Sequence, residues 1–131
     1  MHSSIAITCR VCGDEPLEVQ RVIALANLGD DSPAHASRGV CDGMTERYIN
    51  IEQFVVPHFE DAVTALIGIA EQCRQRYEPL FEFKPIATHE LYCGLFQKDR
   101  KEATLLLLTP NMMQRLCDLR ISLALNVYQA D

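Results

Sequence analysis

The sequence predicts an α+β fold, because stretches with the hydrophobic period of a strand alternate with stretches that have the period of a helix. Near the C-terminus, apolar residues recur first at helical spacing and then at every second position, and the period changes near Arg120. Along residues 5–11, large apolar side chains occupy every second position, whereas residues 57–77 carry an apolar residue at every third or fourth position. We therefore expect one α+β domain over residues 1–131, with three helices and a mixed or mainly antiparallel sheet of about five strands. The expected order is β-α-β-α-β-β-α-β, ferredoxin-like or a variant of that fold.

The N-terminal half is expected to run from a strand through a helix and a long loop to a second strand. Asp14 is a suitable N-cap for a helix over residues 15–28. Residues 29–43 are rich in Gly, Asp, Ser and other small residues and show no period, so they predict a loop. A loop of this length is often functional, although a solvated connector is the simpler interpretation. In residues 47–56 apolar side chains occupy both odd and even positions, so they would point to both faces of a regular strand. A bulge or break near Gln53 would explain this pattern.

The C-terminal half begins with the longest helix, which Pro57 starts and whose apolar stripe extends to Tyr77. A strand is expected over residues 91–96, followed by a charged hairpin tip over residues 98–102. The apolar run over residues 104–108 suits a central strand.

The chain closes with a helix and a strand that follow one another without a spacer. Thr109 can cap a helix that starts at Pro110, because a threonine oxygen accepts from a free amide and proline has no amide to lose. The strand that follows should turn Leu123 and Leu125 toward the core, so Leu125→Ala is expected to cost about 2–5 kcal/mol.

This closing passage is the most specific motif of the chain. It comprises Leu108, Thr109, Pro110, Met113, Leu116, Leu119, Leu123 and Tyr128. The passage resembles a family of small bacterial domains of unknown function, which close with a Leu-Ser/Thr-Pro helix start, a Leu-x-x-Leu helix and a strand ending in Tyr. The N-terminal half is similar more loosely, through Leu28 and Gly29 at a helix end and Pro33 and Gly39 in the loop. Members commonly carry a Trp at the start of the middle strand and this chain has none, and since the family has no established activity the resemblance implies a fold rather than a function.

The net charge of −6 argues against nucleic acid as the partner, because affinity for a phosphate backbone comes largely from Lys and Arg. An acidic surface favours a basic protein partner, or serves solubility alone. The N-terminus lacks the basic and apolar segments of a signal peptide, and no apolar run approaches the roughly 18 residues of a membrane span. We expect a soluble cytoplasmic protein of unknown oligomeric state.

Of the six cysteines, Cys73 and Cys117 lie on predicted helices and Cys9 and Cys93 in predicted strands, which is typical of small core residues rather than of a compact disulfide framework. Cys9 and Cys12 form a C-x-x-C, which could be redox-active or half of a zinc site. However, Cys9 is expected in a strand, and the only other plausible zinc ligands, His35 and Cys41, match no common zinc module. We expect no metal and no cofactor.

No motif in the sequence names a reaction. The chain has no Gly-x-Ser-x-Gly, no phosphate-binding loop with Lys and no His-Glu-x-x-His. Of the four histidines, His2, His35, His58 and His89, only His35 has neighbours that could take part in chemistry. Whether the protein is an enzyme is therefore uncertain, and a protein without catalytic residues is the stronger expectation.

The first hypothesis is a non-catalytic protein-binding protein, most concretely an immunity protein that neutralises a basic bacterial toxin. Such proteins are small, cytoplasmic and frequently acidic, and they need no catalytic residues. The contact surface would consist of acidic residues in or beside the long loop, namely Asp30, Asp31, Asp42, Glu46 and Glu52.

The second hypothesis is a small-molecule-binding or enzymatic domain with a pocket between the 29–43 loop and the sheet. His35, Arg38 and Arg47 would line that pocket and could hold an anion. A toxin gene directly upstream would favour the first hypothesis, and a metabolic operon would favour the second.

Overall fold

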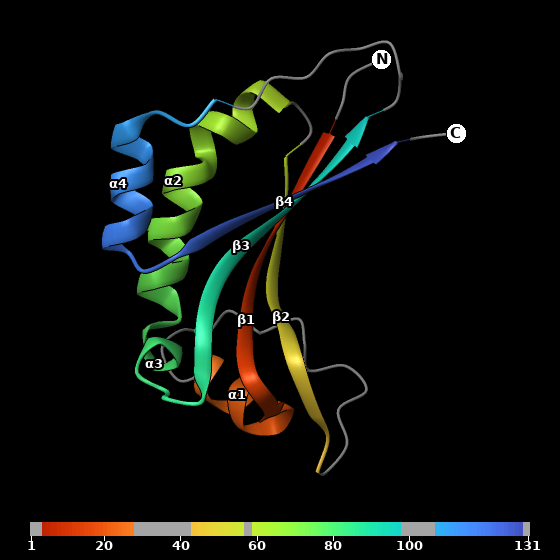
Figure 1. Ribbon diagram of the computed structural model, residues 1–131, viewed down its shortest axis with the longest axis vertical. Coiled ribbons are helices and arrows are strands. Elements are labelled where there is room, and N and C mark those ends of the chain that lie inside the picture. The colour runs from red at the N-terminus through yellow and green to blue at the C-terminus, as the bar shows by residue number, and fades with distance from the viewer. Residues whose placement is uncertain (1–3, 28–42, 57–58, 98–106, 130–131) are drawn as a thin grey trace.

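The computed structural model describes residues 4–27, 43–56, 59–97 and 107–129. This part of the chain forms four strands and four helices, in the order β1-α1-β2-α2-α3-β3-α4-β4 (Figure 1). Their bounds are β1 Ser4–Glu18, α1 Val19–Ala26, β2 Thr45–Val56, α2 Phe59–Arg76, α3 Glu78–Phe81, β3 Ile86–Gln97, α4 Pro110–Asp118 and β4 Ser122–Gln129.

The four strands form one mixed sheet in the order β2-β1-β3-β4. The strand β1 is antiparallel to both of its neighbours, and β3 and β4 are parallel. The predicted α+β class and mixed sheet are thus confirmed. The β1-α1-β2 unit joins antiparallel strands while the β3-α4-β4 unit joins parallel ones, so the two units differ in topology.

The expected fifth strand is not found in the described residues. Residues 104–106 lie outside the described part of the chain, and Leu107 and Leu108 have irregular backbone instead of a strand. Leu107 is 63% exposed, so this end of the apolar run is not the buried centre of a sheet. A short additional helix, α3, follows α2 directly, which makes four helices where three were predicted.

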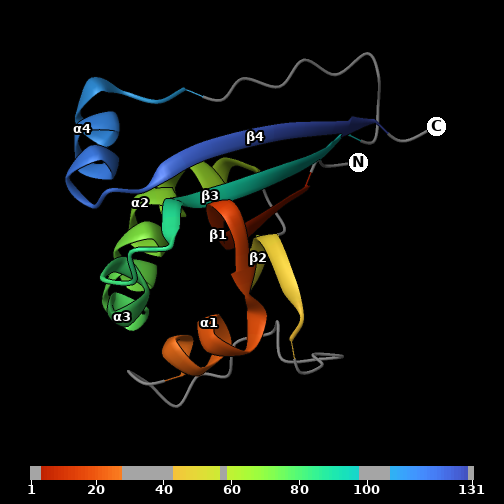
Figure 2. The ribbon, with the colours of Figure 1, turned by 60° about the horizontal axis from the view of Figure 1, so that its bottom comes forward.

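The helices lie together on one side of the sheet, and the core fills the space between them and the strands (Figure 2). Every second residue of β1 and β3 enters this core, as the alternation predicts. Ile7, Leu91 and Ile51 of β2 have no exposed surface. Val22, Ala26, Leu66, Ala70 and Cys73 of the helices, and Tyr77 between α2 and α3, are buried against them.

The first helix starts later than predicted. Strand β1 continues to Glu18, so Asp14 does not cap a helix, and the predicted end at Leu28 lies outside the described residues. Leu17 is only 2% exposed and pairs with Glu46, so its burial in the sheet outweighs the cap that Asp14 offers.

The bulge expected in the second strand is present. The register between β1 and β2 shifts between Cys9, which pairs with Glu52, and Arg10, which pairs with Asn50. The extra residue is Ile51, two positions from the predicted Gln53, and it is fully buried.

The closing helix and strand form as the sequence predicts. The Thr109 hydroxyl accepts from the Met112 amide at 3.2 Å, and Pro110 is the first residue of α4. Arg120, where the period changes, has a φ of 60°.

Leu125 lies on the helix side of the sheet as expected, but the prediction that it is buried there is wrong. Leu123 packs partly against the core, but Leu125 is 45% exposed and Val127 is 47% exposed. The strand β4 extends past the layer of helices, so no helix of the described residues covers its second half on that side (Figure 1). In the described parts of the chain, no helix is long and apolar enough to cross a membrane.

Candidate functional site

The side of the sheet opposite the helices is the most distinctive surface of the described structure, and we call it the open face. Because side chains alternate along a strand, the residues between the core positions point to this side. They are Ala6, Thr8, Arg10 and Cys12 of β1, Tyr48, Asn50, Gln53 and Val55 of β2, Glu90, Tyr92, Gly94 and Phe96 of β3, and Ala124, Asn126 and Tyr128 of β4. Tyr48, Val55, Phe96 and Tyr128 are all more than 40% exposed there.

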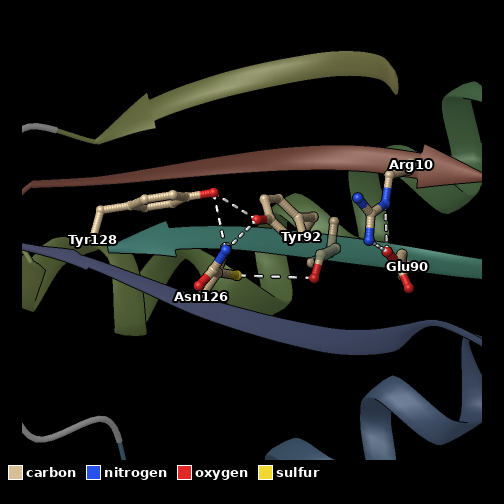
Figure 3. A network of polar contacts seen from close by, with 7 residues as sticks. Arg10, Glu90, Tyr92, Asn126 and Tyr128 are labelled. Atoms are coloured by element: carbon tan, nitrogen blue, oxygen red, sulfur yellow. Dashed lines mark hydrogen bonds and ion pairs between the residues drawn. The ribbon is translucent and has the colours of Figure 1, made fainter. Parts of the chain in front are cut away.

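Two tyrosines and an asparagine form a hydrogen-bonded cluster on the open face (Figure 3). The hydroxyl oxygens of Tyr92 and Tyr128 are 2.8 Å apart. The Asn126 amide donates to Tyr92 at 2.8 Å and to Tyr128 at 3.0 Å. The cluster therefore holds both phenol rings in one orientation.

The parallel register of β3 and β4 brings these side chains together. Phe96 pairs with Tyr128 and Gly94 pairs with Asn126. The rings of Phe96 and Tyr128 stack with centroids 5.1 Å apart and planes 15° apart. A Cβ at Gly94 would lie 3.3 Å from the Tyr128 ring, so glycine leaves the space that this ring occupies.

An ion pair continues the cluster toward β1 (Figure 3). Arg10 and Glu90 are register partners, and the guanidinium donates to the carboxylate. The Arg10 guanidinium carbon also lies 4.3 Å from the centre of the Tyr92 ring and 5.1 Å from that of Tyr48. From β1, Arg10 thus links aromatic residues of β2 and β3 by cation–π contacts, while Glu90 neutralises its charge.

The hydrogen bonds within the cluster shift the pKa values of the two phenols in opposite directions. The bond with Tyr128, followed by that from Asn126, lowers the pKa of Tyr92, whereas the bond to Tyr92 raises the pKa of Tyr128. Both directions fit an arrangement in which the Tyr128 hydroxyl donates to the Tyr92 oxygen.

The C-x-x-C residues point to opposite sides of the sheet. Cys9 lies on the helix side, where a hydrogen bond with Cys73 and burial raise the pKa of its thiol well above the usual value. Cys12 lies on the open face beside Glu90, and burial raises the pKa of its thiol. Two strand residues three positions apart cannot share a metal or form a disulfide, because the alternation separates them.

A second feature is a cleft of about 290 Å³ at the beginning of β3 and β4. Its lining comprises Phe81, Ile86, Ala87, Thr88, His89, Arg120 and Ser122. The rings of Phe81 and His89 stack at 3.8 Å, and the Arg74 guanidinium lies 4.2 Å from the centre of the Phe81 ring. Burial, and to a lesser extent Arg74, lower the pKa of His89 to about 4, so its imidazole is neutral near pH 7.

The backbone at Arg120 is unusual for its residue type. The amide of Ile121 donates to the Leu116 carbonyl and that of Arg120 to the Cys117 carbonyl, which is the Schellman pattern at a helix end. Its left-handed position, here with φ of 60°, is normally taken by glycine. Arg120 lines the cleft, and its left-handed backbone costs about 1 kcal/mol.

Of the residues predicted for the contact surface, two are described. Asp30, Asp31 and Asp42 lie outside the described residues, while Glu46 is exposed on β2. Glu52 is turned to the helix side, and only 14% of its side chain is exposed.

The surroundings of Glu52 indicate a structural role. Its carboxylate accepts two hydrogen bonds from Arg76 at 2.8 and 2.9 Å and one from the Tyr77 hydroxyl. Burial, followed by the bond to Glu52, raises the pKa of Tyr77, and Glu52 raises the pKa of Arg76.

The residues predicted for a ligand pocket are not brought together in the described structure. His35 and Arg38 lie outside the described residues, and Arg47 is exposed on β2 rather than part of the cleft. The cleft uses His89, which the sequence offered only as a residue before a strand. The open face was missed as well, although Tyr92, Phe96 and Tyr128 occupy the outward parity of their strands.

Comparisons of the chain with protein-family models, with curated proteins and with solved structures give no match. The resemblance of the closing motif to a family of small bacterial domains therefore remains an expectation.

Proposed function

We propose that the protein is a non-catalytic protein-binding protein that uses the open face as its contact surface. The observation that carries the proposal is the exposed set of Tyr48, Phe96 and Tyr128 around Arg10 and Tyr92. Tyrosine, phenylalanine and arginine are enriched at protein interfaces, and such residues often dominate the binding energy. Because hydrogen bonds and stacking already fix the rings, little side-chain entropy is lost when a partner covers them.

The most concrete form of this proposal is a bacterial immunity protein that neutralises a basic toxin in the cytoplasm. The ion pair of Arg10 with Glu90 leaves the centre of the open face without excess charge. The net charge of −6 would instead act at long range and steer a basic partner toward the molecule. Charge reversal at Asp30, Asp31 and Asp42 is accordingly expected to slow association and reduce its dependence on salt.

A growth-rescue assay tests this proposal. The proposal expects a toxin gene directly upstream of the gene for this chain, and the product of that upstream gene is expressed with the wild-type protein, with Tyr48→Ala/Tyr128→Ala, or with Met113→Ala. Met113 is a matched control because it is 50% exposed on α4, on the helix side. We expect rescue by the wild type and the control and its loss with the double variant. Equal rescue by all three, or rescue by none, would contradict the proposal.

A second candidate function is the binding of a small anionic molecule in the cleft, which the position of Arg120 favours. The guanidinium and the hydroxyls of Thr88 and Ser122 could hold a carboxylate or phosphate group, and the stacked rings of Phe81 and His89 could pack against its apolar part. Arg120→Gly separates function from fold, since glycine suits the left-handed position and should keep or raise the melting temperature. Small carboxylates and inorganic phosphate should then raise the melting temperature of the wild type only. Equal shifts for both proteins, or no shift for either, would exclude this candidate.

A further inference from the structure

The strand β4 forms an edge of the sheet, since among the described strands only β3 pairs with it. Its sequence from Ser122 to Gln129 contains no charged residue and no proline. Its ladder with β3 runs over eight consecutive pairs without a register shift. The edge is therefore straight and uncharged.

The other edge of the sheet is built differently. The strand β2 carries Glu46, Arg47 and Glu52, and its register with β1 shifts twice. Charges and bulges are the usual means by which proteins keep a sheet edge from pairing with another chain. Since β2 has both and β4 has neither, the two edges differ in their capacity to pair.

We propose that β4 pairs with β4 of a second copy of the chain, antiparallel and around a two-fold axis, so that two sheets become one. The addition of a strand to an exposed edge supplies main-chain hydrogen bonds, and a closed two-fold dimer is the commonest assembly of identical chains. A second copy fits this edge because the edge is uncharged: two chains of net charge −6 meet here without placing like charges opposite one another. A basic partner would find no carboxylate along β4.

The side-chain period limits the register of this pairing. Directly opposite residues in an antiparallel pair point to the same face, so one residue must lie opposite its own copy, and the two-fold axis passes midway between the two. An axis at Asn126 places Leu125 opposite Val127 on the helix side and Ala124 opposite Tyr128 on the open face. This register covers both half-exposed aliphatic residues of β4. It also joins the two open faces into one surface.

The expected dimer is weak. At about 3.3 Å per residue, β4 offers an edge roughly 26 Å long, which buries less than the about 1,200 Å² typical of stable interfaces. We expect a dissociation constant in the micromolar range, so the wild type should change from monomer to dimer between about 1 and about 300 µM.

Sedimentation equilibrium of the full chain over that range tests the proposal. Leu125→Lys and Val127→Lys should each raise the dissociation constant at least tenfold, because they place charges at the pairing edge. Val55→Lys is the matched control, since Val55 is 71% exposed on the opposite edge strand, and it should dimerise as the wild type does. Thermal melts of all variants report on folding. A wild type that stays monomeric at every concentration, or dimers that both lysine variants leave unchanged, would overturn the proposal.

Cysteine cross-linking tests the register. In a chain with Cys41→Ser and Cys117→Ser, Asn126→Cys should form a disulfide-linked dimer under mild oxidation, while Gln53→Cys on β2 should not. The Asn126→Cys dimer should disappear when Val127→Lys is added. Equal cross-linking at both positions, or none at position 126 at a concentration where the wild type is dimeric, would contradict pairing about Asn126. Because these experiments measure self-association and the growth assay measures toxin neutralisation, each proposal can fail without the other.

Discussion

Glu52 provides a sharp test of the distinction between a structural carboxylate and a contact carboxylate. Removing it with Glu52→Ala deprives the Arg76 guanidinium and the Tyr77 hydroxyl of the acceptor they share. Breaking a buried ion pair by deleting one partner costs about 3–5 kcal/mol. The side chains of Glu52 and Arg76 are 14% and 18% exposed, so part of this cost is screened by solvent. We expect a loss of about 2–4 kcal/mol in the free energy of unfolding.

Glu46→Ala is the matched control for this substitution. Glu46 lies on the same strand but is exposed, so its removal should change the stability by less than about 0.5 kcal/mol. Urea denaturation followed by circular dichroism measures both values at pH 7. A loss below about 0.5 kcal/mol for Glu52→Ala, or equal losses for the two variants, would refute the structural role of the carboxylate.

Three further expectations concern single residues. The pKa of His89 is about 4 in the folded chain and about 6.5 in the unfolded chain, so its contribution to stability is complete above pH 6.5 and is lost as the pH falls toward 4. His89→Phe should therefore reduce the pH dependence of the free energy of unfolding, measured by urea denaturation, between pH 4 and 6.5. An unchanged pH dependence would contradict the burial of the imidazole. Leu123→Ala should destabilise the fold by about 1–3 kcal/mol and Leu125→Ala by less than about 1 kcal/mol, and the reverse order in denaturation would show that the half-exposure of Leu125 is wrong. In thiol titration of a Cys41→Ser chain, Cys117 should react at once, whereas Cys93, whose pKa burial raises to about 11, should react only on unfolding; rapid reaction of Cys93 would contradict its burial.

Local features of the fold could be predicted because they depend on residues close in sequence. The cap at Thr109, the helix start at Pro110 and the change of period near Arg120 each follow from a few neighbouring side chains. The bulge in β2 was detectable for the same reason, since apolar residues on both parities conflict with a regular strand. The start of α1 was not predictable, because Leu17 gains its burial from contacts that are distant in sequence.

The open face depends on long-range pairing, which a single sequence does not specify. The outward parity of β3 showed aromatic residues at Tyr92 and Phe96, and Tyr128 occupies the corresponding parity of β4. Only the parallel register of these strands places Asn126 between the two phenols and leaves Gly94 beneath a ring. The strand predicted over residues 104–108 rested on composition alone, and an apolar stretch has the same composition whether or not it pairs with a sheet. Leu107 and Leu108, the described end of this run, are not in a strand.

The open face is the central element of this account, and calorimetric titration of the purified chain with the product of the upstream gene, which the proposal expects to be a toxin, tests it most directly. We expect Tyr128→Ala and Tyr48→Ala each to raise the dissociation constant about tenfold or more, as truncation of a central interface aromatic does. Met113→Ala should leave the dissociation constant within about twofold of the wild type, because Met113 lies on the helix side. Unchanged affinity for both tyrosine variants, or a larger loss for Met113→Ala, would contradict the assignment of the open face as the contact surface.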